Sequence, residues 1–458
     1  MKSIHPIKSR RTRLLPLLLA TLGLATAFTA AAESVALRHV RVIDGQGGTP
    51  VTNATVLIED GVIAAVGPDA EVAVPAGARQ IDLRGRSVLP GLISDHSHLG
   101  MTDGTTAGPQ NYTRANIERQ LKQFQRYGVT TVTSLGMNGP LFQSLRAEAH
   151  AGTLPGADVF GADRGIGVPD GAPPMNVGPD QLYRPATAEE ARAAVRDMAT
   201  RKPDLVKVWV DDFNHTLEYK MTPEIYGAVI DESHKLGLRV AAHVYYLDDA
   251  KKLVAAGADI LAHGVRDAPV DDELIAAMKA AGTWYVSTLD LDEAFFIYAE
   301  QPAWMKSPFF RAALQPQLAA EFDDAAWRSK TLSDPKKLAT WQDALKTNQA
   351  NLKRMVDAGV KVGFGTDSGA TPLRIPGFAE HRELQLAVQA GLTPLQAIRM
   401  ATHDAAALLG LDDRGVIAAG KRADLIVVAG DPSRQITDSE KVESVWQRGQ
   451  QVSASVVP

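Results

Sequence analysis

The middle of the chain, residues 91–415, alternates short apolar runs with longer stretches of helical periodicity. Runs at 129–134 and 239–242 are rich in valine, threonine and alanine, whereas residues 188–200 and 223–236 have the spacing of amphipathic helices. Strands that alternate with helices of about 10 to 15 residues are typical of parallel βα units. About eight such units fit into this stretch, which therefore predicts a closed, TIM-like (β/α)8 barrel.

Strand-like stretches flank this region at both ends of the chain. Residues 35–43 alternate apolar and polar side chains with period two, and residues 423–428 are again strand-like. Period-two alternation indicates a half-buried strand. We therefore expect a small β-sandwich domain built from residues 33–90 together with 416–458, beside a barrel of residues 91–415.

The segment from about 290 to 350 is too long for a single connection between barrel elements. It is rich in aromatic and charged residues and has helical stretches. We expect a helical insertion that serves either as a lid or as a contact between copies of the chain in a homo-oligomer.

The first 32 residues have the composition of an export signal. Five basic residues and no acidic ones precede Leu14, an apolar stretch runs to Phe28, and small residues end at Ala32. We expect cleavage near Ala32 and a periplasmic or secreted bacterial protein. Ser9-Arg10-Arg11 leaves the twin-arginine route open beside the general secretory route. An uncleaved anchor is the weaker alternative because Pro16 interrupts a short apolar stretch, and no later run is long enough to span a bilayer.

Composition excludes several classes of function. The chain has no Cys, which rules out disulfides, a thiolate nucleophile and cysteine-ligated zinc. It has 48 Lys and Arg against 53 Asp and Glu, a net charge of −5. This balance argues against general nucleic-acid binding. The partner that we expect is a small-molecule substrate, for the reasons given below.

Two histidines follow the first expected barrel strand. Residues 87–93 form a strand-like run, and His96 and His98 come after it at positions i and i+2. Side chains two residues apart on a strand point to the same side, which in a barrel is the interior at the carboxyl-terminal mouth. Imidazole is a common ligand of zinc and similar divalent ions, although packed or surface histidines have the same spacing.

Four more polar residues lie at or near the ends of later apolar runs, namely Lys207, His243, His263 and Asp367. Each taken alone also fits a structural role, as a salt-bridged lysine, a hydrogen-bonded histidine or a capping aspartate. Lys207 shares a face of its run with Leu205 and Trp209, and an unpaired buried ammonium is costly. We therefore expect Lys207 to be paired, deprotonated or chemically altered, and the whole set to bind metal at one mouth.

Four motifs occur in a fixed order along nearly the whole chain after residue 32. They are Val42-Ile43-Asp44-Gly45, residues 88–98, Gly365-Thr366-Asp367 and residues 420–425. At these motifs the chain resembles the amidohydrolase superfamily, and within it the imidazolonepropionase-like and Xaa-Pro dipeptidase-like members. The resemblance implies a metal-carrying barrel and a small β-sandwich built from both termini.

The resemblance also implies two divalent metal ions, with zinc as the expected metal and manganese, cobalt or iron left open. It assigns the ligands as His96, His98 and Asp367 for one ion, and His243 and His263 for the other. Lys207 would be carboxylated by CO2 and bridge both ions. Such a carbamate replaces a costly buried cation with an anion that offers two oxygens to two cations.

The implied mechanism begins with a hydroxide that bridges the metals and attacks the scissile carbonyl of an amide or peptide bond. Asp367 takes the proton of the hydroxide and passes it to the leaving nitrogen. Tyr245 resembles a tyrosine that contacts the substrate or oxyanion in dipeptidase-like relatives, although packing at the barrel rim also explains it. Mononuclear deaminases usually carry a glutamate three residues after the histidine equivalent to His243. This chain has Tyr246 there, which favours the binuclear hydrolytic branch.

Loops beyond the expected strands offer further contacts to substrate. Asp211, Asp212 and His215 follow the strand of Lys207, and His381 and Glu383 follow that of Asp367. From these we take three candidate substrate-binding residues, namely Asp212, His215 and His381.

The expected substrates are dipeptides or N-acyl amino acids, Xaa-Pro dipeptides included. Hydrolysis of a lactone, a cyclic amide or a xenobiotic amide by the same site is the alternative. A third reading, from another class of function, is a barrel that binds a ligand without catalysis. The sequence does not name the substrate, because specificity lies in loops that follow no simple code.

Overall fold

The computed structural model describes Met1 and residues 34–456. The predicted export signal therefore lies outside the described residues, apart from Met1. Within residues 34–456, no helix is both long enough and apolar enough to cross a membrane.

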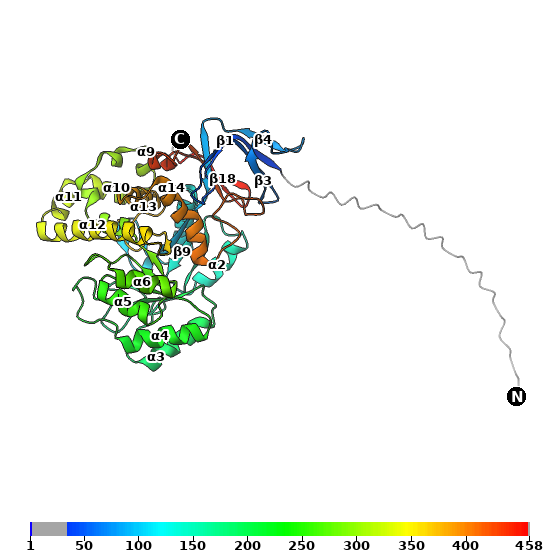
Figure 1. Cartoon of the computed structure of the whole chain (residues 1–458). Helices are drawn as coiled ribbons and strands as arrows, with labels where there is room; N and C mark the ends of the chain where they lie inside the picture. The colour runs from blue at the N-terminus through cyan, green and yellow to red at the C-terminus, as the bar shows by residue number, and fades with distance from the viewer. Residues whose placement is uncertain (2–33, 457–458) are drawn as a thin grey trace. The chain divides into compact units, whose positions relative to one another are not determined.

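One sheet of eight strands contains segments from both ends of the chain (Figure 1). Its strand order is β18-β17-β16-β5-β1-β2-β3, with β4 paired to β1. The strands are β1 (Val35–Val42), β2 (Val51–Glu59), β3 (Val62–Pro68), β4 (Arg79–Asp82), β5 (Arg86–Pro90), β16 (Leu425–Ala429), β17 (Val442–Gln447) and β18 (Gln450–Ser453). Strand β5 pairs in parallel with β1 and antiparallel with β16, which joins the two ends of the chain. The sandwich form and the domain limits stay predictions.

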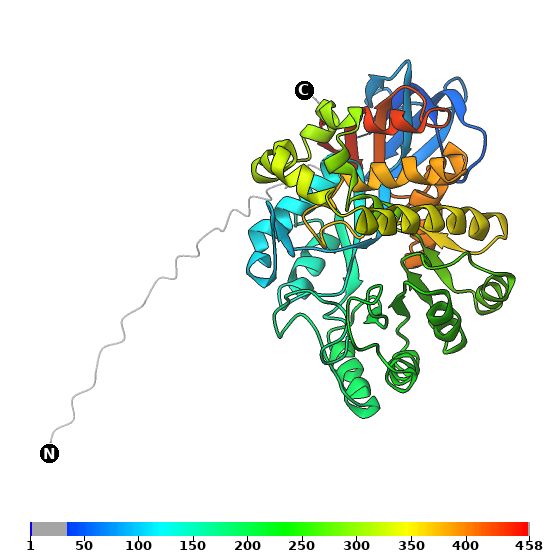
Figure 2. The ribbon, with the colours of Figure 1, turned by 90° about the vertical axis from the view of Figure 1, so that its left-hand side faces the viewer.

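The sheet of the termini has its own apolar core, which includes Leu37, Val56, Ile63 and Trp446. Leu37, Val56 and Ile63 come from the first three strands of the sheet, and Trp446 comes from β17 near the other end of the chain. Burial alternates only in the second half of β1, where Val40 and Val42 are buried and Arg41 between them is partly exposed, whereas the first three residues of β1 are all buried. In the view of Figure 2 the blue and red strands again lie side by side.

Eight further strands pair in parallel in two sheets, ordered β10-β9-β6 and β11-β12-β13-β14-β15. They are β6 (Leu92–Ser97), β9 (Val129–Leu135), β10 (Asp158–Ala162), β11 (Val206–Trp209), β12 (Val240–His243), β13 (Ile260–Ala262), β14 (Trp284–Val286) and β15 (Val362–Gly363). Single parallel bridges join Ala162 to Leu205 and Ser97 to Ser368. A two-stranded ribbon of β7 (Thr102–Asp103) and β8 (Thr106–Ala107) follows β6.

Helices lie between these strands, so the predicted α/β alternation is confirmed. They are α1 (Arg114–Arg126), α2 (Phe142–His150), α3 (Ala188–Ala199), α4 (Pro223–Lys235), α5 (Leu247–Ala255), α6 (Asp272–Ala281), α13 (Phe378–Gln389), α14 (Pro394–Arg399) and α15 (Ala405–Leu409). Helix α3 buries Ala191, Ala194, Val195 and Met198, the spacing of one helical face. Its first turn is capped by Thr187, which accepts a hydrogen bond from the Glu190 amide.

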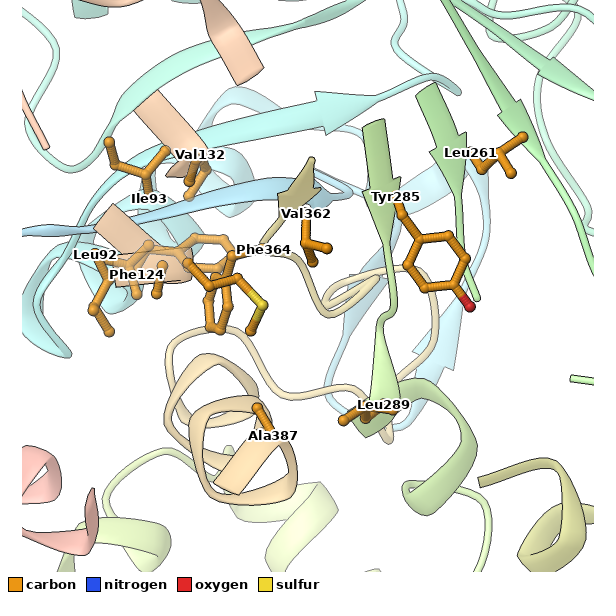
Figure 3. Packing of buried hydrophobic residues seen from close by; sticks show 14 of the residues in the cluster. Leu92, Ile93, Phe124, Val132, Leu261, Tyr285, Leu289, Val362, Phe364 and Ala387 are labelled. Carbon is orange, nitrogen blue, oxygen red and sulfur yellow. The ribbon is translucent and has the colours of Figure 1, made fainter. Parts of the chain in front are cut away.

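The core of the parallel sheets is formed by side chains from strands and helices together. Figure 3 shows Ile93 of β6, Val132 of β9 and Val362 of β15 in one cluster with Phe124 of α1 and Ala387 of α13. All five side chains are at least nine-tenths buried. This packing holds the carboxyl ends of the strands in fixed positions, where the polar residues lie.

The segment after β14 is helical and packs around aromatic side chains. Its helices are α7 (Leu289–Glu293), α8 (Ile297–Glu300), α9 (Pro308–Arg311), α10 (Pro316–Asp323), α11 (Ala325–Thr331) and α12 (Pro335–Asp357). The rings of Tyr298 and Phe322 stack at 4.5 Å between centroids, and Phe310 lies 5.7 Å from Tyr298. Residues of this insertion line the cavity described below. A contact between copies of the chain stays a prediction.

Candidate metal centre

The six predicted metal ligands lie close together at the carboxyl ends of five parallel strands. His96 is on β6 and His98 follows it, Lys207 is on β11, His243 ends β12, His263 follows β13, and Asp367 lies beyond β15. All six are buried. The ring of His263 lies 4.4 Å from those of both His96 and His243, which links the two ends of the cluster.

Three of these residues already have the spacing that one metal ion requires. Ligand atoms of His96, His263 and Asp367 all lie within 4.8 Å of one another. One carboxylate oxygen of Asp367, Oδ1, lies 3.2 Å from His96 Nε2 and 3.0 Å from His98 Nε2. Imidazole nitrogens converging on a carboxylate oxygen are a donor set that suits zinc and similar ions.

Hydrogen bonds on the outer side of the rings orient two of the histidines. His98 Nδ1 lies 3.3 Å from the Gly136 carbonyl oxygen. Because a carbonyl only accepts, Nδ1 of His98 carries the proton and Nε2 presents its lone pair to the cluster. His263 Nδ1 makes a similar contact of 2.9 Å with Thr288 Oγ1. Metal-binding histidines typically use their second nitrogen in this way.

His243 is held by two residues of the loop after β11. Its Nε2 lies 3.3 Å from Asp211 Oδ2, and its ring stacks on Phe213 at 4.5 Å with an interplanar angle of 9°. Asp211 is completely buried, and its Oδ1 accepts a hydrogen bond from the Phe213 amide. With Nε2 facing a carboxylate, Nδ1 of His243 has no hydrogen-bond partner among the described residues and is the nitrogen that would be available to a metal ion. The sequence indicated only that Asp211 lies in a loop near the mouth. Its contact with His243 was not predicted.

Burial favours the neutral form of three histidines, His96, His243 and His263. Burial lowers the pKa of His96 to about 3 and the pKa of His263 well below its ordinary value. Burial also lowers the pKa of His243, although Asp211 opposes the shift. Only the neutral ring can bind a metal ion, so these rings are competent ligands at neutral pH.

Lys207 is fully buried, and among the described residues its Nζ has no hydrogen-bond partner. Burial lowers the pKa of Lys207 from 10.5 to about 7, although Asp367 and Asp211 oppose this. Its Nζ lies 5.3 Å from the centroid of the Trp209 ring. Both ring nitrogens of His96 also lack a hydrogen bond within residues 34–456. Buried polar atoms nearly always have partners, and divalent cations are the partners that this donor set fits.

Asp367 connects the cluster to an arginine that the sequence reasoning did not single out. While Oδ1 faces the histidines, Oδ2 accepts a hydrogen bond from the guanidinium of Arg374. Burial opposes the shift, but Arg374 and the two neighbouring histidines hold the pKa of Asp367 well below its usual range. The backbone of Asp367 has φ 59°, a left-handed conformation that is uncommon outside glycine and is often found at functional sites.

A cavity of about 330 Å³ opens onto this cluster. His98, His243, His263 and Asp367 line it, together with apolar side chains from the loops and the insertion, namely Met137, Trp209, Phe213, Leu291, Phe295 and Trp341. A wider outer cavity of about 730 Å³ shares Tyr245 and Arg266 with it. Tyr245 therefore lies where both cavities meet, with the Arg266 guanidinium 4.8 Å from its ring centroid.

Of the three predicted substrate-binding residues, only His215 lines one of the two cavities. His215 lines the outer cavity and is largely exposed. Asp212 Oδ2 lies 3.2 Å from Nδ1 of His215, and Asp212 Oδ1 accepts a hydrogen bond of 2.6 Å from the Tyr246 hydroxyl. His381 lies on α13 and lines neither cavity, because its nitrogens contact the Tyr127 carbonyl at 2.7 Å and Ser439 Oγ at 3.1 Å. Its position gives no support to a substrate contact.

Residues 87–452 match the model of the amidohydrolase family. The ochratoxinase of Aspergillus niger is 25% identical over 444 residues, which covers 88% of this chain and 83% of the relative. The imidazolonepropionase of Deinococcus radiodurans is 25% identical over 395 residues, covering 84% and 88%. The crystal structure of a putative prolidase from Bifidobacterium longum is 26% identical with a TM-score of 0.72, covering 92% and 94%.

Changing Asp211 tests its role in orienting His243. We expect Asp211→Asn to lower zinc affinity by about 10-fold or more, because the charge that polarises the His243 ring is lost. Asp212→Asn is the matched control, since that carboxylate contacts Tyr246 and His215 instead. Zinc affinity is measured by competition with a chelator, and equal affinities for both variants would contradict the assignment.

Proposed function

Since the chain belongs to the amidohydrolase family and is therefore a hydrolase of carbon–nitrogen bonds, we propose that it cleaves an amide or peptide bond in dipeptides or N-acyl amino acids. The observation that carries this proposal is the convergence of six buried donor side chains beside a cavity. The family and the enzyme class inferred from the sequence are confirmed, which removes the alternative of a barrel without catalysis.

We assign two divalent metal ions to the cluster. The proposed ligands are His96, His98 and Asp367 for one ion, His243 and His263 for the other, and a carboxylated Lys207 between them. When bound, such ions polarise a carbonyl oxygen and bring the pKa of a water molecule towards neutrality. The unpartnered nitrogens of His96 and Lys207 support this assignment, because each needs a partner that the described chain does not provide.

Asp367 is the proposed proton carrier. Its carboxylate lies within reach of the histidines on one side, and it forms the wall of the cavity on the other. It would accept a proton from the attacking water and donate it to the leaving nitrogen. Arg374 and the histidines outweigh burial and lower the pKa of Asp367, which favours release of the proton to the leaving nitrogen over its uptake from water.

Tyr245 is the proposed donor to the oxygen of the scissile carbonyl. It lines the cavity beside His243 and His263. Burial raises the pKa of Tyr245, so its hydroxyl keeps the proton that a hydrogen bond to a developing negative charge requires. Apolar side chains around the cavity limit the access of bulk water, which strengthens such an interaction.

Two further proposals concern the whole chain. The single parallel bridges at Ala162 and Ser97 support closure of the eight parallel strands into a (β/α)8 barrel.

The composition of residues 1–32 supports export from a bacterial cytoplasm. We expect protein recovered from the periplasm or medium to begin at Glu33 when its amino terminus is sequenced, and an intact Met1 there would refute cleavage.

Hydrolysis is tested with the zinc-loaded chain on a mixed library of dipeptides and N-acyl amino acids, read by mass spectrometry. We expect cleavage of a subset, and a loss of about 10³-fold or more in Asp367→Asn, with ligand binding retained. Asp357→Asn, at the exposed end of α12, is the control that should keep full activity. Zinc content is measured for each variant. Turnover by zinc-loaded Asp367→Asn at the wild-type rate would contradict the role of Asp367.

Lys207 is tested by its chemistry with CO2. The low pKa of Lys207 leaves a large neutral fraction near pH 7. A neutral amine attacks CO2, so that a nitrogen–carbon bond forms and one proton is released. We expect the native mass or a crystal structure to show one added carboxyl group, and Lys207→Ala to lose zinc that short carboxylic acids partly restore. Lys235→Ala on the surface of α4 is the control. A fully metallated, active Lys207→Ala variant would refute the bridge.

A further inference from the structure

We infer that Arg374 binds the α-carboxylate of the amino acid on the nitrogen side of the scissile bond. The aromatic side chain of that amino acid packs against Phe295 and Trp341. The substrate class is an amide whose released amine is an aromatic amino acid. This inference rests on the proposed function, because it names the substrate of the same site.

Arg374 has an unused edge in the wall of the cavity. Its side chain is 9% exposed, and one terminal nitrogen donates to Asp367. Its Nε is buried and has no hydrogen-bond partner in the described part of the chain. A guanidinium presents its donors as a rigid fork that matches a carboxylate in a bidentate way. Arg374 lines the cavity, so the edge formed by Nε and the terminal nitrogen that does not bond Asp367 suits a ligand carboxylate.

The other cationic groups of the cavity are already engaged or lie at its rim. Arg266 donates to Asp292 at 3.1 Å and to the Val244 carbonyl at 3.3 Å, although its Nε also has no hydrogen bond within residues 34–456. Lys337 is exposed and lies 4.9 Å from the ring centroid of Trp341. The cavity is lined by three cationic side chains against the two carboxylates of Asp292 and Asp367. This excess of positive charge favours an anionic ligand.

The closeness of the metal cluster and Arg374 favours a substrate with an α-carboxylate over one with a more distant carboxylate. Asp367 faces the histidines with Oδ1 and bonds Arg374 with Oδ2, so one carboxylate group separates the metal cluster from the guanidinium. In an N-acyl amino acid the carboxylate is separated from the scissile carbonyl only by the amide nitrogen and the α-carbon. A substrate with its carbonyl at the cluster therefore brings its α-carboxylate to Arg374.

An aromatic wall adjoins the guanidinium. The Phe295 ring centroid lies 5.2 Å from Arg374 Cζ, and Phe295 stacks on Trp341 at 5.1 Å with an interplanar angle of 11°. A residue whose carboxylate binds Arg374 thus has its side chain beside two stacked rings. Aromatic side chains prefer such offset or stacked partners. Met137, Trp209 and Phe213 line the same cavity from the strand loops and would receive the acyl group.

The test compares N-acetyl-L-phenylalanine, its carboxamide and N-acetyl-L-alanine as substrates of the zinc-loaded chain. We expect kcat/KM for the carboxylate to exceed that for the carboxamide on the order of 10- to 100-fold, because a charge-assisted bidentate contact is lost. Arg374→Met should bring this ratio close to one, whereas Lys235→Met removes a charge on the surface of α4, away from both cavities, and should leave it unchanged. Phe295→Ala should lower the preference for phenylalanine over alanine.

Equilibrium binding gives a readout that does not depend on turnover. N-methanesulfonyl-L-phenylalanine and its carboxamide carry a sulfonamide in place of the scissile N-acyl bond, and their affinities are measured by calorimetry. We expect the wild type to bind the carboxylate more tightly than the carboxamide, and Arg374→Met to bind both equally. If that variant loses zinc, Arg374→Lys keeps a charge beside Asp367 but not the fork, and discrimination should then fall partly. Undiminished discrimination in a zinc-loaded Arg374 variant would overturn the inference.

Different results would contradict the carboxylate site at Arg374 and the proposed hydrolase activity. A wild type that hydrolyses the carboxylate and the carboxamide equally well would overturn the role of Arg374 and leave the hydrolase intact. A wild type that cleaves no amide but binds the sulfonyl carboxylate more tightly than its carboxamide would overturn the proposed function and keep the carboxylate site.

Discussion

The burial of Lys207 is the constraint around which the site is organised. Its amine lies at the centre of the parallel strands with no hydrogen-bond partner in the described chain. An ammonium in such a place would be costly, so the pKa of Lys207 falls and the neutral, reactive form becomes abundant. The surrounding groups add imidazole nitrogens and carboxylates but no complete set of hydrogen bonds. Leaving buried polar groups without partners is costly, and cationic partners or a chemical change at the lysine would lower that cost.

Asp367 couples this cluster to the cavity. Its two oxygens face in different directions, one to the histidines and one to Arg374. The left-handed backbone at Asp367 is held by the surrounding structure, including the amide of Asp367, which donates to the His96 carbonyl. One carboxylate thereby links the chemistry proposed for the strand ends with the recognition proposed for the loops.

The helical insertion after β14 supplies part of the apolar lining of the cavity. Leu291, Phe295 and Trp341 come from it and close the cavity opposite the strand loops. A family fold provides the barrel and the donor set, whereas substrate choice depends on segments that vary around them. The similarity to proteins described as a prolidase, an ochratoxinase and an imidazolonepropionase fits this division, since the fold is shared and the names differ.

The sequence by itself determined the α/β alternation, the family and the six donors at the strand ends. The alternation and the donor positions follow from local rules, because a side chain's direction on a strand is set by its position and parallel strands end at one edge. The family was indicated by the resemblance of four ordered motifs. Only the tertiary structure revealed Asp211 behind His243, Arg374 beside Asp367, and the Phe295–Trp341 wall. It also placed His381 outside both cavities. These contacts depend on the paths of loops and helices, which obey no periodic pattern, so no spacing in the sequence could indicate them.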